Sequence, residues 1–403
     1  MTKNLNKILD TISLGLQEVI DEGRSLDQVC SYWIKQNPQW NAYEKGYFAE
    51  TLTEVVRWWR LLFTIVTTVF NPKNKEQYRL MVLTFLLIKR NDDIVYDYFS
   101  PSIVKSIKST YNDLKSNRAI YNSVPDWLDQ LGSNELGELW PLELDALNNL
   151  PSIVLRVNTL KTTKENLASS LAKNGYILSS EELPYGIVLK KRSDIYGSKE
   201  FTLGLFEQQD ASSQLVAPFL LVEPGMRVID ACAGNGGKTL HLACLMKNKG
   251  KILALDNADW KLEELMRRSS RAGVTIIEPR PITSTKVVKR LKDSADRLLL
   301  DVPCSGLGVL RRNPDSKWRL NPEKIEELKK AQSQILDRYT QMVKPGGKFV
   351  YSTCSILPSE NQLQIQSFIN RTNGEYILEE EKIISPSKSG YDGFYMARLR
   401  KIS

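Results

Sequence analysis

Two cysteines of this sequence follow short apolar stretches and could act on one substrate. Cys304 lies in DVPCSG, directly after the run RLLL, and Cys354 lies in YSTCS, after GKFV. Runs of this kind are typical of buried parallel strands, whose carboxyl ends meet at one edge of a sheet. If the two strands are neighbours, both thiols are expected to face the same crevice.

A Gly-rich segment predicts what else binds at this edge. VIDACAGNGGKT (228–239) has the pattern of a strand, a tight turn and a helix, and Asp256 ends the next predicted strand. Glycines let the backbone approach a ligand, and an acid at the second strand end can accept hydrogen bonds from ribose hydroxyls. The spacing matches neither a dinucleotide fingerprint nor a P-loop. An adenosine-containing cofactor without a diphosphate is indicated, and S-adenosyl-L-methionine fits better than NAD or ATP.

A thiol pair beside such a cofactor suits methylation of a pyrimidine at carbon 5. Carbon 5 is a poor nucleophile, and addition of a thiolate to carbon 6 pushes electron density onto it. One cysteine can attack while the other assists product release, and Asp301 can hydrogen-bond the base and stabilise developing charge. Single free cysteines are often only small buried hydrophobes. Two of them at matching strand ends behind a nucleoside loop favour the catalytic interpretation.

Together these motifs resemble the RsmB/Nop/Sun family of S-adenosylmethionine-dependent RNA cytosine-5 methyltransferases. The resemblance implies Cys354 as the nucleophile, Cys304 as the release cysteine, and Asp301 as an acid near cofactor and base. The motifs that carry it are LRVNTLK (155–161), QQDASSQ (208–214), DACAGNGGKT (230–239), Asp256, DVPCSGLGVLRRNPDSKW (301–318) and YSTCSILPSEN (351–361). The cofactor-binding residues that it implies are Cys232, Ala233, Gly234, Asn235, Gly236, Gly237, Lys238, Asp256 and Asp301.

The resemblance is incomplete after the third predicted strand of the cofactor-binding region. Family members carry an acid there that contacts the cofactor's adenine, whereas this chain has EPRPITST (278–285) without an aspartate. A backbone contact or Thr283 is expected to replace it. Asn235 also stands where the family usually has proline.

Three regions are expected to position these residues. Residues 1–145 show apolar side chains at helical spacing and resemble the NusB-like RNA-binding helical domain. Residues 146–204 predict a small α/β accessory unit, similar to an RNA-recognition module. Residues 205–403 predict the catalytic domain, an α/β Rossmann-like class I methyltransferase sheet with a final antiparallel hairpin. In LPSEN, Ser359 is expected to cap a helix, with Gln362 at the capping-box position.

The charge balance favours a polyanionic partner. The net charge is +8 and the isoelectric point is near 9.0, so Lys and Arg side chains can neutralise phosphates and release counterions. A solvated basic surface is the alternative explanation. The cations nearest the motifs are predicted to contact RNA, with Trp318 beside them for base stacking: Arg156, Lys161, Arg311, Arg312 and Lys317.

Other classes of protein are disfavoured. The five cysteines are scattered without a C-x-x-C pair, which argues against a disulfide framework or a zinc ribbon. The one histidine, His241, is expected to be an ordinary helix residue, so Ser-His-Asp hydrolysis is not supported. The start of the chain has no signal-peptide pattern, and the apolar run Leu61–Phe70 is too short for a bilayer, which needs about 20 residues. We expect a cytoplasmic, metal-free monomer.

The function predicted from the sequence is methylation of cytosine carbon 5 in RNA. Ribosomal RNA, in a single-stranded segment or hairpin loop, is the expected target. Two alternatives stay open: a DNA cytosine-5 methyltransferase, in which the cysteine of the Pro-Cys motif attacks, and a non-catalytic RNA-binding or ribosome-assembly factor.

Overall fold

The chain folds into two compact units. The computed structural model describes residues 2–72, 76–191 and 193–402. The first unit comprises Met1–Asn149 and Leu310–Pro322, and the second comprises Leu150–Val309 and Glu323–Ser403. The small α/β region therefore belongs to the same unit as the large sheet.

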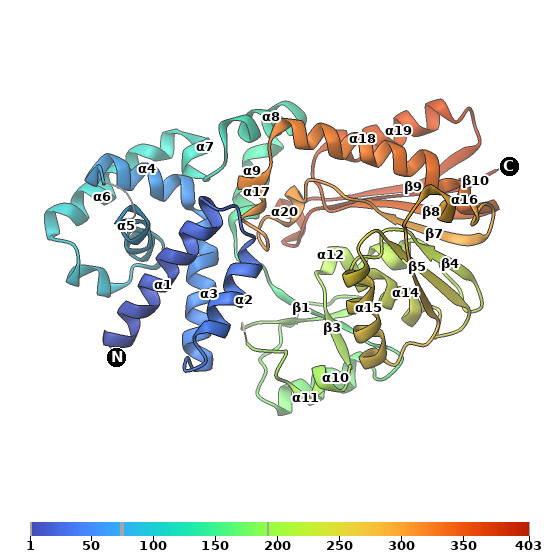
Figure 1. Ribbon diagram of the computed structural model, residues 1–403, viewed down its shortest axis with the longest axis horizontal. Helices are drawn as coiled ribbons and strands as arrows, with labels where there is room; N and C mark the ends of the chain where they lie inside the picture. Colours follow the sequence, from blue (N-terminus) through green and yellow to red (C-terminus); the bar gives the residue numbers. More distant parts are fainter. Residues whose placement is uncertain (1, 73–75, 192, 403) are drawn as a thin grey trace. The chain divides into compact units, whose positions relative to one another are not determined.

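The first unit is helical, as the sequence predicts (Figure 1). The apolar positions at helical spacing are buried, and Leu9, Ile12 and Leu16 of its first helix are fully enclosed. Local signals set the helix starts: Ser25 caps the second helix, and Asn41 with Glu44 forms a capping box at the third. Its helices are α1 (Thr2–Ile20), α2 (Leu26–Gln36), α3 (Ala42–Arg57), α4 (Trp59–Phe70), α5 (Glu76–Phe85) with the π-turn Leu86–Arg90, α6 (Pro101–Asp113), α7 (Arg118–Tyr121), α8 (Asp126–Leu136), α9 (Leu139–Asn148) and α17 (Ser316–Arg319).

The segment Leu310–Pro322 is held in this unit by Arg57 of α3. The Arg57 side chain is 1% exposed, and its guanidinium donates to the carbonyl oxygens of Leu310 (3.2 Å) and Arg311 (2.8 Å). In return, the Lys317 ammonium donates to the Arg57 carbonyl (2.9 Å). The guanidinium also pairs with Glu54 at 2.9 Å, so the buried charge has a partner.

The second unit contains a three-stranded antiparallel sheet of order β2-β1-β3. Its strands are β1 (Ile153–Val157), β2 (Gly186–Leu189) and β3 (Phe206–Gln208), with α10 (Lys164–Lys173) and α11 (Lys199–Thr202) alongside. Thr163 caps α10. Leu178 adds only a single antiparallel bridge to Leu189, at the edge of this sheet.

The large sheet has the order β6-β5-β4-β7-β8-β10-β9 and confirms the predicted Rossmann-like architecture. Strands β6 to β8 run parallel, and β10 and β9 add the predicted antiparallel hairpin. The strands are β4 (Arg227–Asp230), β5 (Lys251–Asp256), β6 (Ile277–Pro281), β7 (Ala295–Asp301), β8 (Val343–Thr353), β9 (Tyr376–Ile384) and β10 (Phe394–Lys401). The helices are α12 (Ala211–Gln214), α13 (Val216–Phe219), α14 (Gly237–Leu245), α15 (Asp259–Ala272), α16 (Thr285–Lys289), α18 (Pro322–Tyr339), α19 (Gln362–Arg371) and α20 (Pro386–Ser389).

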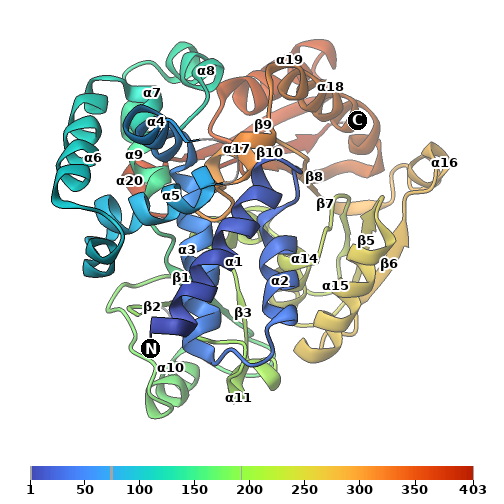
Figure 2. The same cartoon turned by 60° about the vertical axis from the view of Figure 1, so that its left-hand side comes forward.

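Helices cover both faces of this sheet, which is why its parallel strands are almost continuously apolar. Leu299 and Val350 pack with side chains of α13, α14 and α15 on one face. Leu300 and Tyr351, the next residues along the same strands, pack with α16, α18 and α19 on the other face. Figures 1 and 2 show the two helical layers.

The predicted cap of α19 is wrong. Ser359 lies inside a 3₁₀ turn, Pro358–Glu360, and α19 begins at Gln362 with Asn361 in the N-cap position. Tertiary bonds override the local signal here. Asn361 donates from Nδ2 to the Ser355 carbonyl (3.0 Å) and accepts from Thr353, and the Glu360 carboxylate bonds to Ser305.

We predict that Arg57→Ala destabilises the chain by about 3–5 kcal/mol, because it leaves the Glu54 carboxylate and several buried carbonyls without their donor. Urea unfolding of the full chain measures the effect. Arg79→Ala, which removes an exposed ion pair with Asp10, is the control and should lower the free energy of unfolding by about 1 kcal/mol or less. An equal loss of unfolding free energy in the two variants would contradict the role of Arg57 in holding the segment Leu310–Pro322.

Candidate active site

The Gly-rich loop between β4 and α14 forms the tight turn that its glycines predict. Gly234 (φ +53°) and Gly236 (φ +83°) lie in the left-handed region, which other residues rarely adopt. A Cβ on Gly236 would lie 2.6 Å from Leu265 Cγ. Asp256, at the end of β5, braces the loop: its Oδ2 accepts from Gly234 N at 2.9 Å.

A cavity of about 280 Å³ opens above this loop. It brings together the predicted residues Cys232, Ala233, Gly234, Asn235, Gly237, Lys238 and Asp301. Two predicted residues do not line it, because Gly236 packs on Leu265 and Asp256 braces the loop from beside it. Five further lining residues were not predicted, although the QQDASSQ and DACAGNGGKT motifs contain four of them: Gln208, Gln209, Ser213, Asp230 and Arg268.

Asp230 gives this cavity a buried acceptor. Its Oδ2 accepts from the Thr239 hydroxyl at 2.7 Å, whereas Oδ1 has no hydrogen-bond partner among the described residues. Burial raises the pKa of this carboxyl to about 7. An orphaned carboxylate oxygen, together with the Asp256 carboxylate, fits a ligand that carries ribose hydroxyls and an amino group, as S-adenosyl-L-methionine does.

The two predicted cysteines meet at the neighbouring strand ends. β7 pairs with β8 in parallel, and the Sγ atoms of Cys304 and Cys354 lie 3.5 Å apart. Gly308 N donates to the Cys354 carbonyl at 2.9 Å, and a Cβ on Gly308 would lie only 2.7 Å from that oxygen. The glycine after the Pro-Cys motif thus permits the close approach of the two loops.

Charge is distributed unequally around the thiols. The hydrogen bond with Cys354, together with burial, raises the pKa of Cys304 well above its usual value, and the charge of Glu360 adds to this. Burial alone would lower the pKa of Lys238, but the charges of Asp301 and Cys354 raise it. The charge of Glu360 therefore acts on Cys304, while the Lys238 ammonium pairs with Asp301 at 2.6 Å.

Asp301 links the cofactor cavity to the cysteine loops. Its Oδ2 accepts from the Lys238 ammonium at 2.6 Å, and its Oδ1 accepts from the Ser352 hydroxyl at 2.9 Å. Ser352 precedes Cys354 by two residues. One charged donor and one neutral donor thereby fix the direction of this carboxylate.

Three of the predicted RNA-contacting residues are buried, which corrects the prediction for them. Arg156 donates to Gln209 and to the Gly237 carbonyl, so it fastens β1 to the start of α14. Arg311 donates to the Ala146 carbonyl, and Lys317 to the Arg57 carbonyl. Each is at most 4% exposed. Their charged groups satisfy backbone carbonyls inside the protein and do not face solvent.

The other two predicted RNA-contacting residues are less enclosed. Arg312 is half-buried and Lys161 is exposed. The Lys161 ammonium nevertheless donates to the carbonyls of Leu203 (2.9 Å) and Arg271 (2.6 Å), so it also has a structural role.

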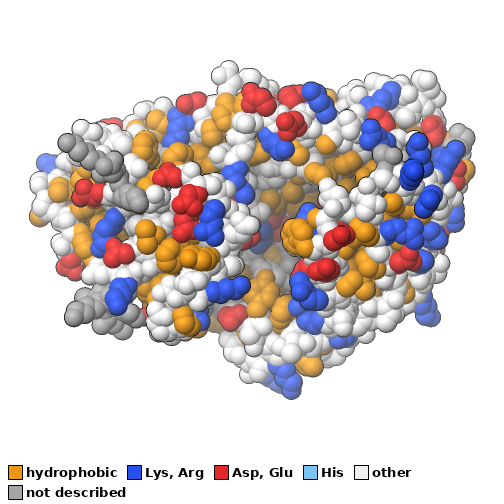
Figure 3. Space-filling view, in the orientation of Figure 1, with side chains coloured by type: hydrophobic (Ala, Val, Ile, Leu, Met, Phe, Trp, Pro, Cys, Tyr) orange, Lys and Arg blue, Asp and Glu red, His pale blue; other side chains and the backbone are white. Residues whose placement is uncertain are grey.

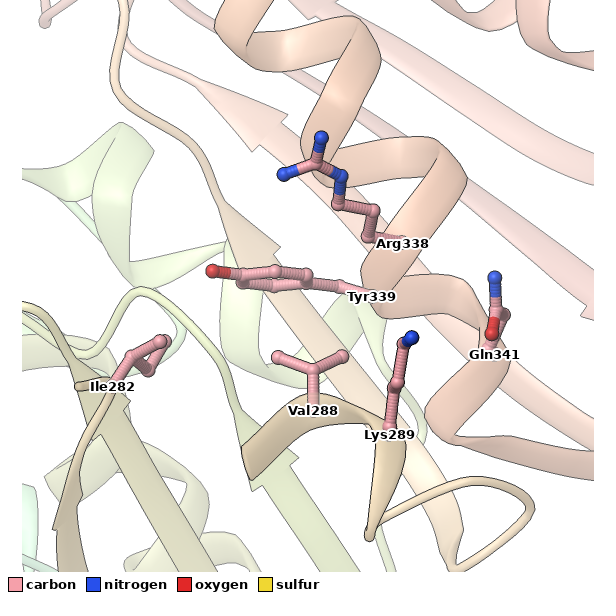
Figure 4. Close-up of a pocket in the computed structure, with 6 residues that line it drawn as sticks. All are labelled: Ile282, Val288, Lys289, Arg338, Tyr339 and Gln341. Carbon is pink, nitrogen blue, oxygen red and sulfur yellow. The ribbon is translucent and has the colours of Figure 1, made fainter. Parts of the chain in front are cut away.

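The segment without the expected aspartate borders a second cavity, of about 320 Å³ (Figure 4). Ile282 N donates to the Asp256 carbonyl at 2.8 Å, which places this segment beside Asp256, the residue predicted to contact ribose. Glu278 cannot replace the aspartate, because it pairs with Lys251 and Arg280. Thr283 is exposed and does not line the cavity. The lining residues are Ile282, Val288, Lys289, Arg338, Tyr339 and Gln341.

The one histidine, His241, is a helix residue, as the sequence predicts. His241 is buried on α14, and burial together with the Arg156 charge lowers its pKa well below the usual value. Within residues 2–72, 76–191 and 193–402, no group of three or more His, Cys, Asp or Glu side chains is arranged to hold a metal ion. None of the helices in those ranges is long and apolar enough to cross a membrane.

The sequence is similar to families of ribosomal RNA methyltransferases. Residues 217–400 match the family model "16S rRNA methyltransferase RsmB/F", and residues 124–196 match the ferredoxin-like domain of RsmF/B-like methyltransferases. Among curated relatives, the probable ribosomal RNA small subunit methyltransferase B of Synechocystis is 38% identical over 300 residues, covering 69% of this chain and 67% of that protein. The corresponding Bacillus subtilis protein is 34% identical over 295 residues, covering 69% and 65%. The matched part therefore spans about two thirds of the length of these relatives.

Solved structures share the fold. The protein PH0851 superposes with a TM-score of 0.79 at 25% identity, over 98% of this chain and 97% of its own. A methyltransferase homolog from Pyrococcus horikoshii has a TM-score of 0.63 at 26% identity, over 75% of this chain and 100% of its own. The Gly-rich loop, the acidic cavity and the similarity to these methyltransferases all indicate S-adenosyl-L-methionine as the methyl donor. The chain belongs to the RsmB/F family of ribosomal RNA methyltransferases, which use S-adenosyl-L-methionine.

Proposed function

We propose that this chain methylates carbon 5 of a cytosine in ribosomal RNA through a covalent bond between Cys354 and carbon 6. The observation that carries this proposal is the pair of thiols 3.5 Å apart, next to the cavity lined by Asp230 and Asp301. Two thiols on adjoining strand ends can serve one pyrimidine, because one can attack carbon 6 while the other assists release of the product. S-adenosyl-L-methionine supplies the electrophilic methyl group.

The charges around the pair favour Cys354 as the attacking group. The Glu360 carboxylate disfavours a thiolate on Cys304, because its negative charge raises the pKa of that thiol. Cys304 then keeps its proton and donates a hydrogen bond to the Cys354 sulfur. A DNA-type enzyme, with Cys304 as the nucleophile, would need the opposite distribution.

The same arrangement supports the later steps. Attack forms the bond between Cys354 Sγ and carbon 6 and makes carbon 5 nucleophilic towards the methyl group. After transfer, the carbon 5 proton passes to water while the bond to Cys354 breaks. Cys304 lies within 3.5 Å and can return a hydrogen bond to the departing thiolate. Asp301, fixed by Lys238 and Ser352, stabilises the base during attack.

An exposed group of cations offers a surface for the RNA backbone. Lys289 and Arg338 line the cavity around the Tyr339 ring, and Lys286, Arg290 and Lys292 are exposed on or just after α16. None of these five forms an ion pair with any other residue whose placement the structure describes. Figure 3 shows Lys and Arg gathered on the side where Figure 1 places α16. Unpaired cations beside an aromatic ring suit phosphates and an unstacked base.

The cysteine roles are tested by covalent trapping. We predict that Cys354→Ala forms no covalent enzyme–RNA adduct and loses methylation, because carbon 5 is never activated. Cys304→Ala should attack, methylate and stall, giving an adduct that survives denaturing electrophoresis. Asp301→Asn should slow adduct formation by about 10²–10³-fold.

Cys30→Ala, which changes a thiol on α2, is the matched control and should behave as the unmodified chain. The reverse pattern, with an adduct in Cys354→Ala and none in Cys304→Ala, would exchange the two roles. Methyl transfer only to a matched DNA hairpin would favour the DNA alternative. Absence of any transfer with intact RNA binding would favour the assembly-factor alternative.

Asp230 is expected to make stability depend on pH. Its folded pKa of about 7 lies above the unfolded value of 3.8, so between these values the folded state holds a proton that the unfolded state has released. The free energy of unfolding should therefore fall as pH rises from 4 to 7, by at most about 4 kcal/mol. Asp230→Asn should remove this slope. Urea unfolding between pH 4 and 8, without cofactor, measures it, and identical slopes for both proteins would contradict the burial argument.

The cationic surface is tested by salt dependence. Lys289→Gln with Arg338→Gln should weaken RNA binding and reduce the slope of log affinity against log salt by about 0.7 for each phosphate that the variant no longer neutralises. Cofactor affinity should stay unchanged. Lys329→Gln, whose ammonium pairs with Glu326 on α18, is the matched control. An unchanged slope in the double variant would remove this surface from the RNA interface.

A further inference from the structure

A buried carboxylate joins the two cysteine loops. Glu360 is fully enclosed, and its Oε1 accepts from Ser305 N (2.8 Å) and from Gln332 Nε2 (2.9 Å). Its Oε2 accepts from the Ser305 hydroxyl. Gln332 Nε2 also donates to the Pro303 carbonyl at 3.0 Å. Glu360, from the loop after β8, thus holds Ser305 directly, and Gln332 connects it to Pro303 on the other side of Cys304.

The bonds made by Glu360 fix the spacing of the thiols. Each cysteine is followed directly by a serine, and the Oγ atoms of Ser305 and Ser355 lie 3.2 Å apart, next to the Sγ pair at 3.5 Å. The two loops therefore meet as two adjacent pairs, one of serines and one of cysteines. Because Glu360 holds Ser305 by both its backbone N–H and its hydroxyl, a shift of either loop would break several buried hydrogen bonds at once.

A neutral side chain could provide such a cross-link, but the charge has an additional effect. Within the described part of the chain, no Lys, Arg or His forms an ion pair with Glu360, and three neutral donors stabilise the carboxylate instead. An ionised group without a cation in the protein interior carries a large desolvation penalty. It also acts strongly on nearby ionisable groups, because the local dielectric is low. Two groups of this kind lie close to Glu360: Tyr351, whose hydroxyl donates to the Glu360 carbonyl at 2.6 Å, and Cys304, which precedes Ser305.

We propose that Glu360 is a positioning residue of the thiol pair: its hydrogen bonds set the distance between Cys304 and Cys354, and its charge keeps the shared proton on Cys304. This inference rests on the proposed function for its catalytic meaning. Its physical content, the spacing and protonation of two thiols, is measurable without RNA or cofactor. The distance between the two thiols and the choice of nucleophile then depend on Glu360, a side chain that is not proposed to contact the base or the methyl donor.

The charge effect is tested on Cys304 alone. In the Cys354→Ala background, the rate of iodoacetamide labelling at Cys304 is followed against pH by peptide mass spectrometry. Adding Glu360→Gln should increase the rate about tenfold at a given pH, which is one unit in the pKa of the thiol. Glu360→Asp, which keeps the charge, should restore the slow rate. Glu326→Gln, an exposed carboxylate on α18, should leave it unchanged. Equal rates with and without Glu360→Gln would overturn the charge effect.

The spacing is tested on the intact pair with phenylarsine oxide, which bridges two thiols with loss of one water. Ser305→Ala and Glu360→Asp should each weaken its binding at least tenfold, because they loosen the loops while keeping the charge. Unchanged affinity in both variants would overturn the positioning role.

Folding is monitored in the same samples, since the thiol of Cys244 is buried and should react slowly in every folded variant. If Glu360→Gln exposes this thiol, Ser305→Ala and Glu360→Asp still test the spacing of Cys304 and Cys354. Glu360→Asp then decides the charge effect, because Cys304 must stay as slow as in the parent. Loss of methyl transfer with all these thiol measurements as expected would count against the proposed function and not against this inference.

Discussion

The parallel pairing of β7 with β8 is the constraint on which the site depends. Asp301 lies opposite Ser352 in this register, so the loops that follow both strands leave the sheet side by side. A shift by one residue would turn every side chain of a strand to the other face. The apolar layers on both faces exclude such a shift, since Leu299 and Val350 belong to one layer and Leu300 and Tyr351 to the other. Core packing therefore places the loops that carry Cys304 and Cys354 next to each other.

Several charged side chains surround the pair formed by Cys304 and Cys354. Asp230 and Asp256 place two carboxyl groups at the Gly-rich loop. The ion pair between Lys238 and Asp301 lies between this loop and the cysteine loops. Glu360 adds a carboxylate that accepts from Ser305, the residue after Cys304. Charges act strongly where water is excluded, so this one fixed carboxylate helps to raise the proton affinity of Cys304.

The basic residues divide into two groups with different physical roles. Arg57, Arg156 and Lys317 are buried, and their donors satisfy backbone carbonyls between distant segments of the same unit. Lysine and arginine are suited to this because each offers several donors, which a loop rich in unpaired carbonyls requires. The cations on and near α16 are exposed and unpaired among the described residues. Net positive charge by itself does not separate these groups, because burial depends on contacts between residues far apart in the sequence.

The sequence by itself determined the elements and the chemistry of the site. Strand patterns, the Gly-rich loop, Asp256 and the two cysteines were readable because each depends on local spacing or on a side chain's own reactivity. Only the tertiary structure decided which polar groups meet. Ser359 has a capping pattern, yet Glu360 and Asn361 make long-range bonds that shift the start of α19. Arg156 and Lys317 look like phosphate contacts in sequence and are enclosed in the fold. No sequence pattern marks Glu360 as a charge without a cation, or Asp230 as a carboxyl with an unpaired oxygen. That property arises from desolvation, which depends on everything packed around a group and on nothing in its immediate neighbours along the chain.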